Sequence, residues 1–116
     1  MANTFKVKTH AAMSASSGTP ETLYTCPGST TAIVLGLTLA NVHTAAVTAS
    51  VKIESDTSDT ETNATVHVVK DVSILSGSSL ELMSGNKYVL QATDVLKIDC
   101  SVSAKIDATL SIMEIT

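Results

Sequence analysis

From Thr30 to the C-terminus, apolar residues alternate with polar ones at a period of two, and short runs rich in Gly, Ser and Asn interrupt the alternation. A period of two places successive side chains on opposite faces of a β-strand. No stretch of the chain repeats its apolar residues at the helical spacing of about 3.6 residues. The pattern therefore predicts an all-β protein whose strands each have one apolar face.

We expect about eight strands, spaced about a dozen residues apart along the chain. They are predicted at residues 4–13, 21–26, 31–41, 47–54, 66–75, 96–102 and 106–115, together with a hairpin over residues 80–90. Such a series is typical of two antiparallel sheets packed face to face, so we predict a jelly-roll or Ig-like β-sandwich, with a closed barrel as the structural alternative. The length of 116 residues fits one domain over residues 1–116, in which residues 1–20 form an N-terminal arm and loop.

The most apolar segment, at residues 31–41, predicts a strand near the centre of a sheet. In a regular strand Ile33, Leu35, Leu37 and Leu39 share one face, and the residues of the opposite face are small or apolar rather than charged. Strands with two apolar faces are usually covered on both sides.

Two hairpins are predicted nearer the C-terminus. Residues 80–90 predict one hairpin around a tight turn at residues 84–86, and the last two strands are expected to pair as the other. At Ile112 the apolar alternation shifts by one residue, so that Met113 and Ile115 point away from Leu110 and Ile112. We expect either a β-bulge at this point or a cover on the far face of the strand.

Composition argues against several classes of binding site. The chain has one Phe, two Tyr and no Trp, so its core must be aliphatic. It also lacks the flat aromatic surfaces on which bases and sugars stack. A net charge of −4, with only seven basic residues, argues against nucleic-acid binding.

The N-terminal residues contain no apolar stretch of the length that a secretion signal needs, which predicts synthesis and folding in a cytosol. The longest apolar run, at residues 32–37, is too short to span a membrane. Because a cytosol is reducing, we expect Cys26 and Cys100 to be small buried residues rather than a disulfide.

No arrangement of residues predicts catalysis, a cofactor or a metal site. His10, His43 and His67 lie on separate segments, without the spacing of zinc ligands. The acidic residues 54–61 lack the Asp and Gly progression of a calcium loop and predict an exposed, solvated loop. No serine lies in a Gly-x-Ser-x-Gly motif, so a hydrolase is not indicated.

Five segments of the chain share their residue pattern with a known family: TLYTCPGSTTAIVLGLTLAN at 22–41, VKDVSI at 69–74, SGSSLE at 76–81, GNKYVL at 85–90 and LSIMEI at 110–115. In their order of strand and turn residues they resemble small structural proteins from the virions of tailed phages, notably phages of marine cyanobacteria. The resemblance implies a non-enzymatic part of a particle, on the head, neck, tail or fibres.

The leading hypothesis is a virion component made in the host cytoplasm: a capsid decoration or cement protein, or a comparable neck or tail accessory subunit. It would self-associate and dock on a larger capsid, neck or tail protein. Subunit contacts are expected at apolar residues that one sandwich has no evident place to bury, namely Phe5, Val7, Met13, Met113 and Ile115. An ordinary edge strand and a bulge are the other explanation of these residues. The alternative function is a host-receptor or glycan-binding module of a tail or fibre, with residues 14–19 and 54–64 as its rim.

Overall fold

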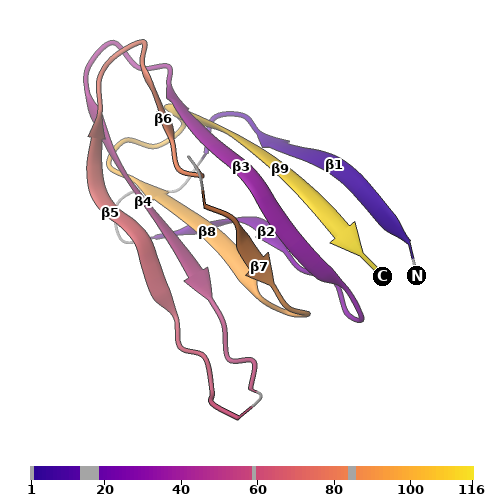
Figure 1. Ribbon diagram of the computed structural model, residues 1–116. Coiled ribbons are helices and arrows are strands. Elements are labelled where there is room, and N and C mark those ends of the chain that lie inside the picture. Colours follow the sequence, from indigo (N-terminus) through magenta and orange to yellow (C-terminus); the bar gives the residue numbers. More distant parts are fainter. Residues whose placement is uncertain (1, 14–18, 59, 84–85) are drawn as a thin grey trace.

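The computed structural model describes residues 2–13, 19–58, 60–83 and 86–116. It confirms an all-β protein with two antiparallel sheets packed as a sandwich (Figure 1). Residues 14–18 of the expected N-terminal loop and the first two residues of the turn expected at 84–86 lie outside the described residues. Within the described part there is no helix long and apolar enough to cross a membrane.

The first sheet, which we call sheet A, has β9 and β3 at its centre. Its strands, in spatial order, are β1 (Asn3–His10), β9 (Ile106–Ile115) and β3 (Thr31–Asn41), followed by β6 (Ser79–Glu81) and β7 (Tyr88–Leu90), which both pair with β3. The central place predicted for residues 31–41 is thus confirmed.

The second sheet, sheet B, lies behind sheet A in Figure 1. Its strands, in spatial order, are β2 (Glu21–Thr25), β8 (Val95–Cys100), β4 (Val47–Glu54) and β5 (Val66–Ile74). All pairings in both sheets are antiparallel.

The strands of the first half of the chain pair with those of the second half in reverse order, starting from the middle of the chain. β4 pairs with its neighbour β5; β3 then pairs with β6 and β7, β2 with β8, and β1 with β9. The two chain ends consequently lie side by side, and Ala2 and Thr116 exchange two backbone hydrogen bonds (Figure 1). A long hairpin rolled in this way into two sheets is a jelly roll, so the Ig-like connectivity and the closed barrel are excluded.

Both hairpins predicted near the C-terminus are wrong. β6 and β7 each pair with a different part of β3 rather than with each other, and β8 and β9 lie in opposite sheets. The reason is that β8 and β9 each have one apolar face, and in opposite sheets these two faces can cover each other. Two strands that pair in one sheet and two strands that lie in opposite sheets have the same alternation of apolar and polar residues, so the alternation cannot distinguish the two arrangements.

A shift of strand phase exists, but it lies in β3 and not in β9. The register between β3 and β9 shifts between Val34 and Gly36, which marks a β-bulge. Val34 and Leu37 are therefore both buried, whereas Leu35 is only half-buried. The expectation that Ile33 and Leu35 share a face with Leu37 is thus wrong.

β9 itself alternates regularly, and its register with β1 is continuous. Its inward row is Ile106, Ala108, Leu110 and Ile112, each at most 2% exposed. The next inward residue is Glu114, so the apolar row ends in a carboxylate, which explains the apparent slip in the sequence.

The core between the sheets is almost wholly aliphatic, as composition predicts. Tyr24 is its one buried aromatic side chain among the described residues. The largest fully buried side chains are Met13, Leu37, Leu39, Leu90, Leu96, Ile98, Ile106, Leu110, Ile112, Val34, Val47 and Val51.

The bulge in β3 predicts unequal costs for two neighbouring leucines. Leu37→Ala should lower the free energy of unfolding by about 2–5 kcal/mol, because it leaves a cavity in the core. Leu35→Ala should cost at most about half as much, since its side chain is only half-buried. Urea unfolding of both variants measures the difference. Equal losses would contradict the bulge and restore a regular strand.

Candidate functional site

β1 is the outer strand of sheet A, and none of its side chains is buried. It is held by a continuous ladder with β9, from Asn3 opposite Ile115 to His10 opposite Ala108. Phe5 and Val7 are 71% and 62% exposed, although they are the largest apolar residues of the strand. A strand that places its apolar side chains in solvent does little for the core, so its surface needs another explanation.

On the outer face of sheet A, one row of apolar side chains crosses four strands. Phe5 lies opposite Met113, Met113 opposite Ile33, and Ile33 opposite Val89. Phe5 and Val89, at the two ends of this row, are the most exposed of the four. Directly paired side chains on one face of a sheet are in contact distance, so the row forms a continuous apolar strip.

Further apolar residues flank this row on the same face. They are Val7 on β1, Ile115 on β9 and Leu35 in the bulge of β3. Together with the row they form what we call the apolar patch: Phe5, Val7, Ile33, Leu35, Val89, Met113 and Ile115. Strand residues with charged side chains appear on this face only at its other end, at Asp107 and Glu81. A contiguous apolar patch on a solvent face is typical of a protein-binding surface.

Four of the five contact residues expected from sequence therefore lie together on the patch: Phe5, Val7, Met113 and Ile115. The fifth, Met13, is fully buried, and its backbone bonds to Ile106 and Ala104 at the start of β9. Met13 therefore anchors the end of the arm within its own sandwich, and we leave it out of the surface.

Three patch residues were missed at the sequence level: Ile33, Leu35 and Val89. Regular alternation assigned Ile33 and Leu35 to the core row, and the bulge at Gly36 reverses that assignment. The single glycine within an otherwise apolar strand was the available signal, because glycine in a strand often marks a bulge.

On the opposite side of β1, a buried carboxylate joins three strands. Lys6 Nζ lies 2.7 Å from Glu114 Oε1, and the Tyr24 hydroxyl donates a hydrogen bond of 2.5 Å to Glu114 Oε2. Glu114 is only 6% exposed. These contacts link β1 and β9 of sheet A to β2 of sheet B at one corner of the sandwich.

The electrostatics of this cluster oppose acid–base chemistry. Hydrogen bonds from Lys6 and then from Tyr24 hold the pKa of Glu114 below its ordinary value. Burial, and next the hydrogen bond to Glu114, raise the pKa of Tyr24 well above its usual range. A carboxylate with a lowered pKa is a weak base, and a phenol with a raised pKa is a weak acid. The cluster is therefore suited to bracing the corner.

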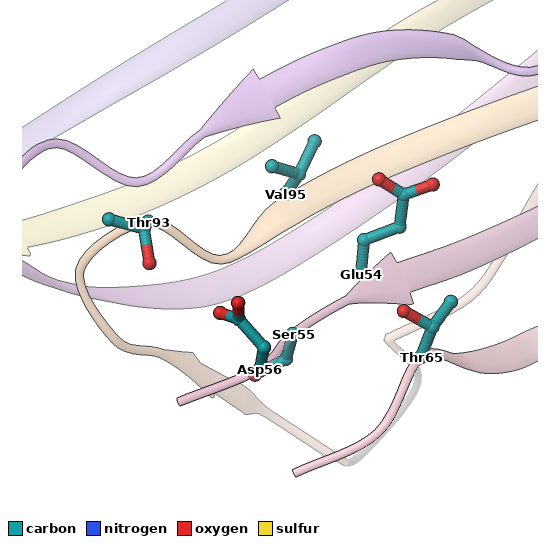
Figure 2. Close-up of a pocket in the computed structure, with 6 residues that line it drawn as sticks. All are labelled: Glu54, Ser55, Asp56, Thr65, Thr93 and Val95. Atoms are coloured by element: carbon teal, nitrogen blue, oxygen red, sulfur yellow. The ribbon is translucent and has the colours of Figure 1, made fainter. Parts of the chain in front are cut away.

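A hollow of about 310 Å³ lies beyond the ends of β4 and β8, where Glu54 and Asp56 are its acidic residues (Figure 2). Both Glu54 oxygens are engaged, one with Lys97 at 3.1 Å and the other with Lys52 at 3.4 Å. Asp56 is exposed. Among the described residues no group of three or more His, Cys, Asp or Glu is placed to hold a metal ion.

A second hollow, of about 420 Å³, lies between the chain after β4 and strand β7. Asp94 at its edge is buried but already accepts hydrogen bonds from the Gln91 amide and the Thr57 hydroxyl. Tyr88 is the aromatic residue of its lining. Asp94 therefore closes a turn, and the other charged residue of the lining, Lys87, is exposed.

The histidines and cysteines do not form a site either. His10 and His67 lie on β1 and β5, in different sheets, and His43 lies between β3 and β4. Cys26 and Cys100 are free and buried, and burial raises the pKa of both thiols. A buried thiol with a raised pKa is a poor nucleophile.

No protein-family model matches the chain, and no curated protein sequence matches it. Among solved structures, it is similar to a chain of the T13 viral particle of infectious bursal disease virus (IBDV), with a TM-score of 0.55 and 14% identity. That match covers 97% of this chain and 30% of the viral chain, so this chain spans about a third of the relative's length. It is also similar to a Bacillus endospore appendage from a family of disulfide-linked pili, with a TM-score of 0.51, 14% identity, and 99% and 87% coverage. At these identities the likeness establishes the shared fold.

The Glu114 cluster predicts a specific dependence of stability on pH. Because the pKa of Glu114 is lower in the folded chain than its ordinary value of 4.5, its contribution is complete above that value and is lost as the pH falls through the folded pKa. Glu114→Gln should therefore be less stable than wild type by about 1 kcal/mol at pH 7. The gap should close in acid, as measured by urea unfolding between neutral and acid pH. A gap that does not change with pH would contradict the ionised cluster.

Proposed function

We propose that this chain is a non-enzymatic structural subunit of a virus particle. More specifically, we propose an accessory protein of a tailed phage, either a capsid decoration or cement protein or a comparable neck or tail subunit. It acts as one β-sandwich domain, associates with copies of itself, and docks on a larger capsid, neck or tail protein. The location that follows is the assembled virion.

The observation that carries this proposal is the apolar patch on sheet A. Phe5, Val7 and Val89 are each at least 60% exposed, and the strand residues around them on that face are uncharged. A solvent face would normally carry charges in these positions, as the outer face of sheet B does at Lys52 and Lys97. The contrast between the two outer faces supports an assembly role for one of them.

Two further findings support the same proposal. The two structural relatives with this fold come from assemblies built of many copies, a viral particle and pili. In addition, two acidic groups at the candidate sites are already paired: Glu114 with Lys6 and Tyr24, and Glu54 with two lysines. Between particle and pilus, the resemblance to phage virion proteins favours the particle.

Binding of a glycan or host receptor is the alternative function. The hollows near residues 54–64 favour it, because they lie beside the loop expected to form a recognition rim. Sugar rings, however, bind by stacking on exposed aromatic side chains, and Tyr88 is half-buried. We therefore rank this function second. Specific binding by the purified protein on a glycan array would reverse the ranking.

The proposed location predicts the composition of purified particles. Mass spectrometry of purified virions should detect peptides of this chain in a fixed ratio to the major shell protein. Gold-labelled antibodies should then mark the head, the neck or the tail. A chain that is abundant in infected cells but absent from purified particles would refute the structural role.

The apolar patch predicts which variants weaken assembly. Phe5→Ser should weaken self-association or particle binding at least about tenfold, because an exposed aromatic residue at an interface is a typical hot spot. Its free energy of unfolding should change by no more than about 0.5 kcal/mol. Sedimentation velocity measures the association.

Leu75→Ser is the matched control, since Leu75 is 67% exposed but follows β5 of sheet B, away from the patch. Equal effects of the two substitutions would indicate a general loss of hydrophobicity rather than a defined surface.

A further inference from the structure

We propose that two copies of the chain pair antiparallel along their β1 strands, with Phe5 on the two-fold axis, so that their A sheets become one continuous sheet. The inference rests on the self-association proposed above and specifies its geometry. Three observations support it: which residues of β1 have free backbone groups, which side chains lie on its outer face, and where its lysines lie.

In the β1–β9 ladder, only every second residue of β1 forms backbone hydrogen bonds to β9, and this alternation determines which backbone groups of β1 are free. Ala2 and Thr116 exchange both of their backbone hydrogen bonds, so they form a hydrogen-bonded pair. In an antiparallel ladder such pairs alternate with pairs that share no hydrogen bond. The even-numbered residues of β1 therefore bond to β9. The N–H and C=O groups of the odd-numbered residues point away from β9, and no described residue pairs with them: Asn3, Phe5, Val7 and Thr9.

These same four residues all carry uncharged side chains on the outer face of sheet A. The even-numbered residues of β1 point to the other face, and the strand's two lysines, Lys6 and Lys8, are among them. A row of free backbone groups beside exposed apolar side chains is a template for another strand. Lysines on an edge strand oppose such pairing, so their positions decide which pairings are possible.

These lysines disfavour several two-fold registers. An axis at Lys6 places the two Lys6 side chains directly opposite each other, and an axis at Val7 places Lys6 opposite Lys8. Like charges directly opposite each other destabilise a pair of strands. Registers that pair an odd residue with an even one are excluded as well, because only the odd residues have free backbone groups.

An axis at Phe5 avoids every like-charged pair. It places Lys6 opposite Thr4 and Lys8 opposite Ala2 of the second copy, and it pairs residues 2–8 with residues 8–2. An axis at Thr4 is also free of this repulsion but pairs only residues 2–6. The axis at Phe5 is thus the longest register without opposed lysines, and about six backbone hydrogen bonds form across it.

The same register continues the apolar row of each copy into that of the other. Phe5 lies opposite Phe5 of the second copy, so the row from Val89 through Ile33, Met113 and Phe5 runs on across the axis. Two aromatic rings that face each other across strands stabilise the pair of strands.

A second copy fits this edge because a two-fold contact needs a self-complementary surface. In the proposed register Asn3 of each copy lies opposite Val7 of the other, and Phe5 lies opposite Phe5, so this edge is self-complementary. In the same register Lys6 and Lys8 of one copy each meet an uncharged residue of the other.

The test uses two variants that each add one cysteine and leave Phe5 intact. In the proposed register Asn3 of one copy is hydrogen-bonded to Val7 of the other, at a Cα separation of about 5.5 Å that a disulfide can span. Asn3→Cys and Val7→Cys, mixed and mildly oxidised, should give a covalent dimer of the two variants. Each variant alone places its two cysteines about 14 Å apart and should not cross-link. The native Cys26 and Cys100 are buried, so they do not interfere.

Val7→Pro is the second variant. The Val7 N–H points away from β9, so proline blocks the free edge without removing a bond of the β1–β9 ladder. It should raise the dimer dissociation constant at least about tenfold while the circular dichroism spectrum is unchanged.

Cross-linking of Val7→Cys with itself would overturn the register. The β1 interface would be overturned if the protein forms an oligomer, the mixture gives no cross-link, and Val7→Pro does not weaken the association. The proposed role as a particle subunit would then still be decided by the composition of purified virions. A monomer at all concentrations would overturn the paired dimer, and the same virion measurement then decides the proposed function separately.

Discussion

The packing of aliphatic side chains between the inward faces of the two sheets is the interaction on which the rest of the structure depends. Burial of one Leu, Ile or Val side chain contributes about 1.5–3 kcal/mol, and every strand except β1 supplies buried or half-buried side chains to the core. A partly exposed ion pair such as Lys6 with Glu114 contributes about 1 kcal/mol or less. The aliphatic core therefore holds the sandwich together, and the polar contacts fix its corners and turns.

β1 is the exception to this principle. It adds a row of backbone hydrogen bonds and the contacts of Lys6 with Glu114 and of His10 with Glu21, but no buried side chain, so its local stability should be lower than that of β9 or β3. Its apolar residues lie outside the core, on the same face as Met113 and Ile33. A strand with this distribution contributes more to the outer surface of sheet A than to the stability of the sandwich, which is why we assign the assembly role to this edge.

The proposed function follows from a contrast between two kinds of surface. At the two hollows Glu54 is paired with two lysines and Asp94 closes a turn, whereas Asp56 and Lys87 are exposed. On the outer face of sheet A, Phe5, Val7 and Val89 remain mostly exposed although they are apolar. This division of the surface is the basis on which we propose contacts with other subunits.

The period-two alternation, by itself, determined that the chain is all-β, that it forms an aliphatic sandwich, and where most of its strands lie. It also indicated four of the apolar patch residues, because Phe5, Val7, Met113 and Ile115 stood out of phase or on a weak strand. Only the tertiary structure decided which strands pair, that β8 and β9 lie in opposite sheets, that a bulge turns Ile33 and Leu35 outward, and that Met13 is buried. The physical reason is that alternation is a local property of each strand, whereas pairing in a jelly roll joins residues as distant as Asn3 and Ile115, and a shift of one residue reverses a face.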